Sequence, residues 1–313
     1  MKNIIVKLYF DGSIHFGNGV LESSSDNLCS DSIFSAICCE YAKSNNTGAI
    51  KELVDNVRKN EIRISDAFPF CGETFYLPKP FVRIESQNNN DSGNKKTIKK
   101  LRFIPAKMFQ EYIDGKMDMA QCKKILNDIS TIGYSGLKEK VCIAVEQDDP
   151  QPYYVGDYTF NEGRGLWFII SADDETYTEE LKDVITSLGL SGIGGKRSSG
   201  YGRFKPIFMD APDFLNDSLN KESQRYITLS VCLPKRDELS DVISHADFSV
   251  IKRSGFVYSL DDQSNAIKKD DMYLMGAGSC FDRKFCGDVY ECSSISKYPV
   301  YRYAKPMFFS IGR

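Results

Sequence analysis

The sequence is poor in the residue types from which most metal and acid–base sites are built. It has only two histidines, His15 and His245, in 313 residues. Its ten cysteines include no CxxC pair, the spacing that builds zinc knuckles. Cys280, Cys286 and Cys292 recur every six residues, a pattern that packing explains better than metal binding because His245 is the only histidine nearby. We therefore expect reduced thiols in the cytoplasm, no metal and no cofactor.

Long apolar runs and an excess of positive charge are also missing. No stretch approaches the roughly 20 apolar residues of a membrane-spanning helix, and the first residues lead into an alternating pattern rather than an apolar signal segment. The formal charge is −3 and the pI about 5.6, so the whole surface cannot act as a non-specific binder of polyanions. We expect no membrane partner, and any nucleic-acid site must be local.

What is present is the composition of a globular protein. Hydrophobic residues make up 42% and charged residues 27% of the chain, which are ordinary globular values. A chain of 313 residues exceeds one ordinary core, since domains usually hold about 100 to 200 residues. Two domains are the natural expectation.

Hydrophobic periodicity predicts strands and helices in a repeated order. Strands are predicted at residues 4–10, 141–145, 153–160, 165–171, 226–233, 250–260, 272–275 and 298–309. Helices are predicted after Ser30-Asp31, at 50–57, at 179–188 and near 238–245, and Ser30-Asp31 can cap the first of these helices. Strand, helix and strand follow one another in both halves. This order predicts an α+β fold of two ferredoxin-like (RRM-like) domains with antiparallel sheets.

Two segments interrupt the pattern. Residues 60–100 carry few regular signals and end in a basic cluster, Lys95, Lys96, Lys99, Lys100 and Arg102, which is equally well read as a solvated loop or as a functional surface. Residues 210–222 are rich in Asp, Asn and Ser and are the best linker candidate. We predict an N-terminal domain of residues 1–212, with an insertion at about 60–140, and a C-terminal domain of residues 213–313.

The most informative segment is a glycine-rich loop at residues 191–204. Five glycines fall within the eleven residues from Gly192 to Gly202, interleaved with Lys196, Arg197 and two serines. Glycine lets backbone amides approach a phosphate closely, while the cations and hydroxyls add charge and donors. The loop is therefore predicted to bind a sugar–phosphate backbone, and a plain helix-to-strand turn does not explain five glycines.

The spacing excludes two nucleotide-binding motifs. A Walker A loop ending at Gly195-Lys196 requires glycine at Leu190 and Ser or Thr at Arg197. A dinucleotide fingerprint starting at Gly192 requires glycine or alanine at Arg197 and a preceding strand, whereas a helix is predicted there. Neither ATP nor a dinucleotide is expected as a ligand.

The loop resembles the signature of the RAMP superfamily of CRISPR proteins, and further motifs narrow the resemblance to the family of the fourth Csm subunit. They occur in the same order along essentially the full length: His15-Phe16-Gly17, Ser30 to Ala36, Asp66 to Phe70, Leu77 to Pro80, Lys252 to Phe256, Gly278 to Phe281 and Tyr301 to Pro306. Each motif is weak by itself. Their joint order is specific.

The resemblance implies a function and partners. The family member is a non-catalytic RNA-binding subunit that anchors the five-prime handle of the CRISPR RNA (crRNA) in a type III-A interference (Csm) complex, in antiviral defence. It joins the large polymerase/cyclase-like subunit to the backbone RAMP subunits. The two ferredoxin-like units face each other across the handle, and the excursion after Pro80 is similar to the thumb that RAMP subunits lay over the guide.

The RNA-binding residues expected from the loop and the resemblance form three groups and one isolated lysine. They are His15, Phe16 and Gly17; Lys79; Gly192, Gly194, Gly195, Lys196, Arg197, Ser198, Ser199, Gly200 and Tyr201; and Lys252, Arg253, Ser254, Gly255 and Phe256. Phe16 and Tyr201 are candidates for base stacking or for the core. The last group is either a second phosphate clamp or a hairpin with solvated charges.

The alternative function is an enzyme. Related CRISPR endonucleases cut RNA without metal and use a histidine as general acid or base, which draws attention to His15. Its sequence neighbours offer no second proton-transfer group, and His245 falls in the other predicted domain. We therefore expect no catalytic residue, and metal-independent processing of CRISPR repeat RNA is the alternative.

Overall fold

The computed structural model describes residues 1–17, 19–82, 92–142, 151–257, 267–293 and 299–312. Parts of the strands predicted at 141–145, 250–260 and 298–309, and the polar tip of the excursion after Pro80, lie outside these residues. Within the described ranges, no helix combines the length and the apolar character that crossing a membrane would require.

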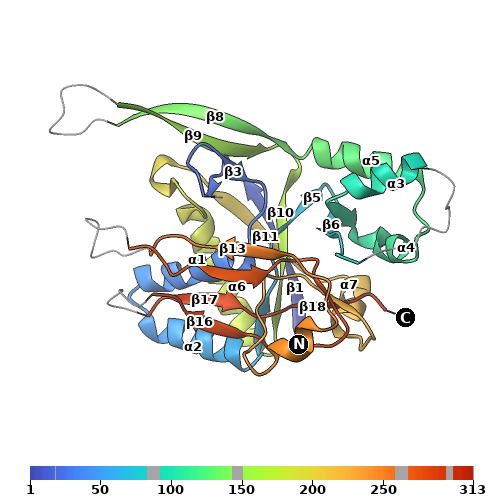
Figure 1. Cartoon of the computed structure of the whole chain (residues 1–313). Coiled ribbons are helices and arrows are strands. Elements are labelled where there is room, and N and C mark those ends of the chain that lie inside the picture. Colours follow the sequence, from blue (N-terminus) through green and yellow to red (C-terminus); the bar gives the residue numbers. More distant parts are fainter. Residues whose placement is uncertain (18, 83–91, 143–150, 258–266, 294–298, 313) are drawn as a thin grey trace.

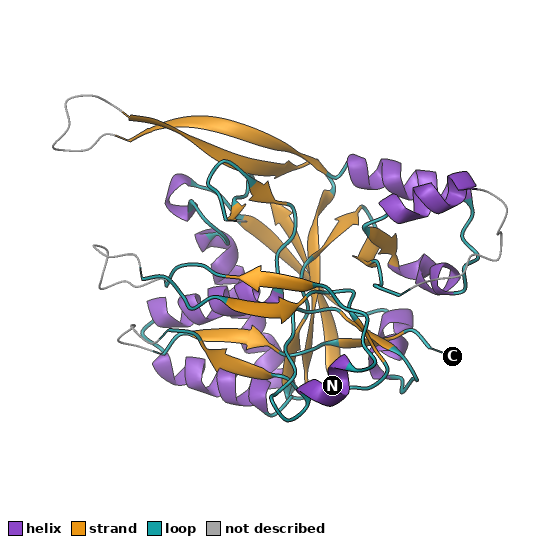
Figure 2. Cartoon of the chain, viewed as in Figure 1, coloured by secondary structure: helices purple, strands orange, loops and turns teal. Residues whose placement is uncertain are grey.

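A central antiparallel sheet organises the N-terminal half (Figures 1 and 2). β1 pairs with β10 on one side and with β11 on the other, while β4 and β5 pair with β10. The bounds are β1 Lys2–Phe10, α1 Ser30–Lys43, α2 Thr47–Arg58, β4 Ile62–Ile64, β5 Phe68–Cys71, β10 Arg164–Ala172, α6 Glu175–Ser191 and β11 Phe204–Asp210. The strand order β11, β1, β10, β4, with α1 and α6 as connections, is the ferredoxin-like arrangement that the sequence predicted.

β1 is buried on both faces. Ile4, Val6 and Leu8 belong to a core beneath α1, α2 and α6, whereas Ile5 belongs to a second core on the opposite face. The alternating pattern at the start of the sequence had indicated only one buried face. The second face is buried because the C-terminal half and α4 pack against it, through residues such as Ile227, Phe309 and Phe109.

The insertion contains more regular structure than the sequence indicated. It comprises β6 Thr74–Pro78, α3 Ser92–Lys100, β7 Phe103–Pro105, the 3₁₀ turn η1 Ala106–Met108, α4 Phe109–Ile113 and α5 Met119–Ser130. We call residues 92–130 the helical knob; it lies at one end of the molecule (Figure 1). Its helices are short and its surface is lysine-rich, so their apolar periodicity is weak.

The element that projects from the body is a later hairpin. β8 Gly133–Cys142 and β9 Gln151–Phe160 pair antiparallel over their full length and extend away from the sheet (Figure 1). We call this hairpin the arm. Tyr134, Leu137 and Val141 of β8 are all exposed, so β8 has no buried face to create an alternating pattern. The sequence had placed the thumb-like projection in the excursion after Pro80 instead.

The predicted linker at 210–222 is wrong as a description of that segment. It forms α7, Asp213–Asn220, whose Leu215 is fully buried against the second core. Phe214 and Leu219 pack partly against the same core, and the polar residues between these three give the helix the composition of a linker.

The C-terminal half consists of short sheets. β12 Tyr226–Thr228 pairs with β15 Cys280–Phe281 and β18 Phe308–Ser310. Two hairpins accompany this sheet: β13 Val250–Arg253 pairs with β14 Met272–Met275, and β16 Asp288–Glu291 pairs with β17 Tyr301–Ala304. The helix α8 spans Leu239–Ile243. In the N-terminal half, β2 Phe16–Gly17 pairs with β3 Ser24–Ser25. Because both cores draw residues from the two halves, the halves stabilise each other.

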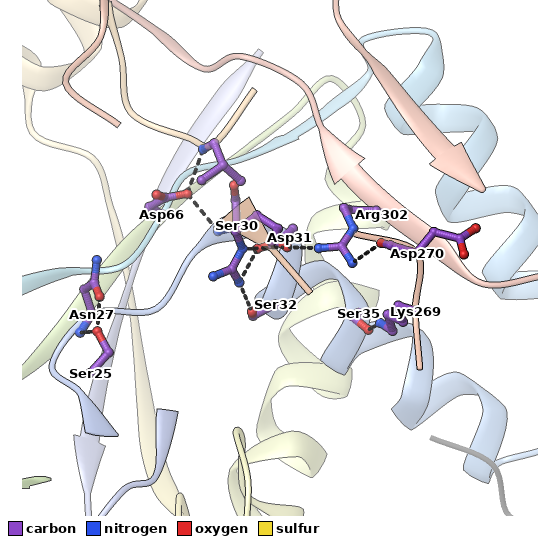
Figure 3. A network of polar contacts seen from close by, with 12 residues as sticks. Ser25, Asn27, Ser30, Asp31, Ser32, Ser35, Asp66, Lys269, Asp270 and Arg302 are labelled. Carbon is purple, nitrogen blue, oxygen red and sulfur yellow. Dashed lines mark hydrogen bonds and ion pairs between the residues drawn. The ribbon is translucent and has the colours of Figure 1, made fainter. Parts of the chain in front are cut away.

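A buried ion cluster joins α1 to the C-terminal half. The Asp31 carboxylate accepts bonds from Arg253 Nε at 3.1 and 3.0 Å and from Arg253 Nη2 at 2.8 Å. Arg302 Nη1 donates to the same carboxylate at 3.3 Å and Arg302 Nη2 to the Asp270 carbonyl at 3.4 Å (Figure 3). Asp31 and Arg302 are buried, and Asp31 lies in the first turn of α1, where negative charge is favoured. The cluster therefore fixes the position of β13 and β17 on α1.

Asp66 makes a second connection between the halves. Its Oδ1 accepts from the amide of Ser30 at 2.8 Å and from the amide of Val231 at 2.9 Å (Figure 3). The helix therefore begins after Cys29 without a side-chain cap of its own, because a distant carboxylate satisfies the first free amide. The predicted Ser30-Asp31 cap is wrong. Burial raises the pKa of Asp66 to about 6.

The ion cluster yields a stability prediction. Asp31→Asn leaves two guanidinium groups facing a neutral amide at a largely buried site, so we expect a loss of roughly 3 kcal/mol in the free energy of unfolding. Urea denaturation measures it. Asp173→Asn, which removes an exposed partner of the N-terminal amine, is the control and should cost under about 1 kcal/mol. Equal losses in the two variants would contradict the role of Asp31.

Asp66 yields a pH prediction. Its pKa is raised from 3.8 to about 6 in the folded chain, so the native state binds more protons than the unfolded state between those values. The contribution of this carboxyl to stability is thus fully present below pH 3.8 and is lost as pH rises through 6. Asp66→Asn does not titrate. The difference in unfolding free energy, wild type minus variant, should therefore be larger at about pH 4.5 than at about pH 7, and a constant difference would refute the assignment.

Candidate nucleic-acid interface

The glycine-rich loop connects α6 to the edge strand β11 and reaches the surface. α6 ends at Ser191, and Gly192 follows with φ of 79° while its amide donates to the Leu188 carbonyl at 2.7 Å. A single 3₁₀ turn, η2 (Arg197–Ser199), forms the tip. The tip residues Ser198, Ser199 and Gly200 are exposed, whereas Ile193 and Tyr201 are buried beneath them.

Most glycine amides of this loop are bonded within the chain. Gly195 donates to the His15 carbonyl at 2.8 Å, Gly200 to Arg197 at 2.9 Å and Gly202 to Ser13 at 3.0 Å. This corrects the expectation that these amides hold a phosphate. The glycines instead let two backbones touch: a Cβ on Gly202 would lie 2.0 Å from the Ile193 carbonyl oxygen, and one on Gly194 would lie 2.8 Å from the His15 carbonyl oxygen.

Side chains are therefore what the loop offers to a polyanion. Lys196 adopts a left-handed conformation with φ of 57°, and its Nζ lies 4.9 Å from the centre of the Tyr153 ring on β9. On β8, Nζ of Lys138 and Nζ of Lys140 lie 5.3 and 4.9 Å from the Tyr201 ring. The outer half of the arm and the loop thus share one face, on which lysines alternate with tyrosines.

His15 and Phe16 lie under the loop rather than on it. Nδ1 of His15 lies 2.7 Å from the Gly156 carbonyl; a carbonyl only accepts, so Nδ1 carries the proton. Phe16 packs in the first core, with its ring centre 6.1 Å from that of Phe10. Of the two interpretations open for Phe16 and Tyr201, the structure favours the core, since both are at most 5% exposed. Their contact with RNA, and that of Gly17, stays a prediction.

The group at 252–256 is only partly available. Arg253 is held by Asp31 and by the Ser32 hydroxyl at 2.8 Å, so its charge is already paired at a largely buried site. Lys252 Nζ lies 2.8 Å from an Asp271 oxygen at the surface. Phe256 is 66% exposed and, with Ser254 and Gly255, keeps the features of an accessible turn. RNA binding by this group stays a prediction. Arg253 also has a structural role, because it pairs with Asp31.

Lys79 lies apart from the other candidates. Its Nζ donates to the Ile98 carbonyl at 2.7 Å, near the C-terminal end of α3, and burial lowers its pKa. The structure does not bring it to the glycine-rich loop. It holds the helical knob against β6.

α1 connects the loop to the C-terminal half. Lys269 Nζ donates to the Ser35 hydroxyl at 2.9 Å (Figure 3). One turn further along α1, burial raises the pKa of Cys39, and the nearby charges of Lys269 and Arg197 oppose this rise. Both cations therefore lie around the same part of α1. We call Lys140, Lys196, Arg197 and Lys269 the cationic track.

Sequence reasoning missed Lys138, Lys140 and Lys269. The first two stand at i and i+2 of β8, so they point to one face of the strand, and this spacing was a usable signal. Lys269 joins the track only through tertiary packing against Ser35, for which the sequence holds no local signal.

Comparisons with known proteins point in one direction. Residues 221–311 match the family described as CRISPR Csm4 C-terminal domain. The chain is 32% identical to the CRISPR system Cms protein Csm4 of Mycobacterium tuberculosis, over 99% of this chain and 98% of the relative. It is 28% identical to the protein of the same name from Streptococcus thermophilus, over 95% of each.

Solved structures share the fold. The chain superposes on Csm4 of a Csm3–Csm4 subcomplex of the type III-A CRISPR-Cas interference complex with a TM-score of 0.68 and 21% identity, covering 99% of each chain. A Csm1–Csm4 cassette in complex with pppApA gives a TM-score of 0.65 and 20% identity, covering 99% of this chain and 97% of the other.

The glycines of the loop yield a prediction with an internal control. Gly200 and Gly202 have φ of 84° and 76°, but only a Cβ on Gly202 meets backbone. Alanine at either position is strained in the left-handed conformation, which lowers the free energy of unfolding by about 1 to 2 kcal/mol. Gly202→Ala should lose a further 1 to 3 kcal/mol or so from overpacking against Ile193. Urea denaturation of both variants measures the difference, and equal losses would show that the close approach is absent.

Proposed function

This chain belongs to the Csm4 family, and we propose that it is a non-catalytic RNA-binding subunit that anchors the five-prime handle of the crRNA in a type III-A interference complex. The cationic track is the observation that carries the proposal. It places cations from the glycine-rich loop, the arm and the C-terminal half around one face of the molecule. A single-stranded backbone crossing this face would meet cations from both halves of the chain.

The chemistry of the track suits RNA whose bases are splayed. Lysine and arginine neutralise phosphates and fix the register of the strand. Tyr153 beside Lys196, and Phe256 on the exposed turn after β13, offer aromatic surface for unstacked bases. The exposed hydroxyls of Ser198 and Ser199 add neutral donors at the tip of the loop.

Assembly with two partners is part of the proposal. The Csm3–Csm4 and Csm1–Csm4 crystal structures pair their own Csm4 chains with a backbone subunit and with a large subunit. We assign the same two partners to this chain. The division into residues 1–212 and 213–313 also belongs to the proposal, and the family match to residues 221–311 supports it.

A non-catalytic role agrees with the surroundings of His15. Its Nδ1–H is held by the Gly156 carbonyl and its ring is 6% exposed, beneath the glycine-rich loop. A metal-independent ribonuclease needs a second proton-transfer group close to the first. His245, the other histidine, lies in the C-terminal half with its ring 3.9 Å from Asp282.

The test is handle binding by Lys196→Ala/Arg197→Ala. Losing two phosphate contacts should weaken binding of handle RNA at least about tenfold and reduce the slope of log affinity against log salt by roughly 1.4. Fluorescence anisotropy over a salt series measures both. The matched control is Lys51→Ala/Lys59→Ala, which removes two exposed lysines of α2 and its C-terminal end, and which should leave both quantities nearly unchanged.

Two outcomes would contradict the proposal. The first is unchanged affinity and salt slope in the loop variant. The second is cleavage of repeat RNA by the purified chain that His15→Ala abolishes, which would establish the endonuclease instead.

A further inference from the structure

The helical knob carries a concentration of positive charge that the handle site does not use. Residues 92–131 contain nine Lys and Arg against four Asp and Glu, in a chain with a formal charge of −3. We propose that the knob is a second nucleic-acid-binding surface, which holds the phosphate backbone of single-stranded RNA without reading its sequence. This inference does not depend on the assignment of the handle to the cationic track.

The lysines form an ordered surface. Lys96, Lys99 and Lys100 stand at i, i+3 and i+4 of α3, so they share one face of the helix, and all three are exposed. Lys123 and Lys124 are exposed on α5, which packs beside α3 (Figure 1). The sequence allowed two interpretations of the basic cluster that ends the excursion, a solvated loop or a functional surface. In the structure these lysines form a stripe on a helix, next to a second basic helix.

These five lysines are unpaired. Within the ranges that the structure describes, no carboxylate lies within ion-pair distance of any of them. Three lysines elsewhere have partners: Lys138 meets Asp157 at 2.7 Å, Lys252 meets Asp271 at 2.8 Å and Lys284 meets Glu222 at 2.6 Å. What distinguishes the knob is that its unpaired lysines gather on two adjacent helices. The knob is thus a place where charge is left available.

The acids of the knob are all engaged otherwise. Asp114 pairs with Lys116 at 2.7 Å, and Asp118 caps α5 through the Gln121 amide at 2.7 Å. Glu111 accepts from the Gln121 side chain at 3.2 Å. Burial raises the pKa of Tyr76, and Asp128 beside its hydroxyl raises it further. None of the four neutralises the lysine stripe.

Both helices that carry the lysines are packed against the second core. Cys122 and Ile125 of α5 are buried in the second core, and Leu101 anchors the end of α3 there. Lys79 reaches from β6 to the Ile98 carbonyl, and burial lowers its pKa. Its charge adds to those of Lys99 and Lys100 at the helix C-terminus, where the macrodipole favours cations.

The composition favours a nucleic-acid backbone over a protein partner. Lysine is depleted at the centres of protein interfaces, and its compact, hydrated ammonium suits a phosphate met as a point charge. The stripe holds no aromatic side chain at 96–100, so base stacking is not expected there. Binding that depends on phosphates and salt, and not on sequence, follows from this chemistry.

The experiment compares two triple variants of the full chain. Lys96→Gln/Lys99→Gln/Lys100→Gln removes the stripe. Lys51→Gln/Lys59→Gln/Lys221→Gln removes three exposed lysines elsewhere and has the same net charge. The probe is labelled polyuridine of about 20 nucleotides, titrated over a salt series against chain that carries one equivalent of unlabelled handle RNA, so that the cationic track is filled without an excess of competitor for the knob.

We expect the stripe variant to bind polyuridine at least about tenfold more weakly, with the salt slope reduced by roughly 2, and the control to match wild type. Handle RNA should bind the stripe variant normally, whereas Lys196→Ala/Arg197→Ala should lose handle RNA and keep polyuridine. Each proposal can therefore fail alone. Unchanged polyuridine binding in the stripe variant, or an equal loss in the control, overturns the inference.

A second probe, double-stranded RNA, distinguishes single-stranded from duplex nucleic acid. The stripe variant should bind polyuridine more weakly than wild type does, whatever the affinity of a double-stranded RNA of the same length. If only the duplex depends on the stripe lysines, the assignment to single-stranded RNA is overturned. Dependence on them for neither probe overturns the nucleic-acid surface as a whole.

Discussion

The structure depends on a carboxylate that two arginines share where the halves of the chain meet. Asp31 stands in the first turn of α1 and is bonded to Arg253 of β13 and Arg302 of β17. Its two partners compensate the cost of burying it, and removing either would leave charge without a counterpart. Asp66 completes the connection through the amides of Ser30 and Val231. Together they hold the C-terminal half on α1.

That placement creates the proposed RNA site. α1 carries Ser35 and Cys39, around which Lys269 of the C-terminal half and Arg197 of the glycine-rich loop lie. Glu40, buried on the same helix, accepts from the Ser187 and Ser191 hydroxyls at 3.2 and 3.1 Å and so holds the end of α6 from which the loop departs. The loop is a packed support for cationic side chains, because most of its glycine amides bond within the chain.

The sequence predicted the elements better than their contacts. Strong periodicity located β1, α1, β10 and α6, and glycine spacing located the loop, because those signals are local. Arg253 was read as a phosphate ligand, yet its partner Asp31 stands 222 residues away. β8 and α7 were missed for different reasons: the first has no buried face, and the second is a short helix whose few apolar residues stand among polar ones. The role of Lys269 follows from packing alone.

The central claim is that one strand of RNA crosses cations from both halves of the chain. Photo-crosslinking of the assembled complex, with 4-thiouridine placed in the handle of the bound guide and crosslinked peptides identified by mass spectrometry, tests it most directly. The account predicts crosslinked peptides from the glycine-rich loop at 191–204 and also from the C-terminal half near Lys269. Crosslinks confined to one half, or absent from both segments, would contradict it.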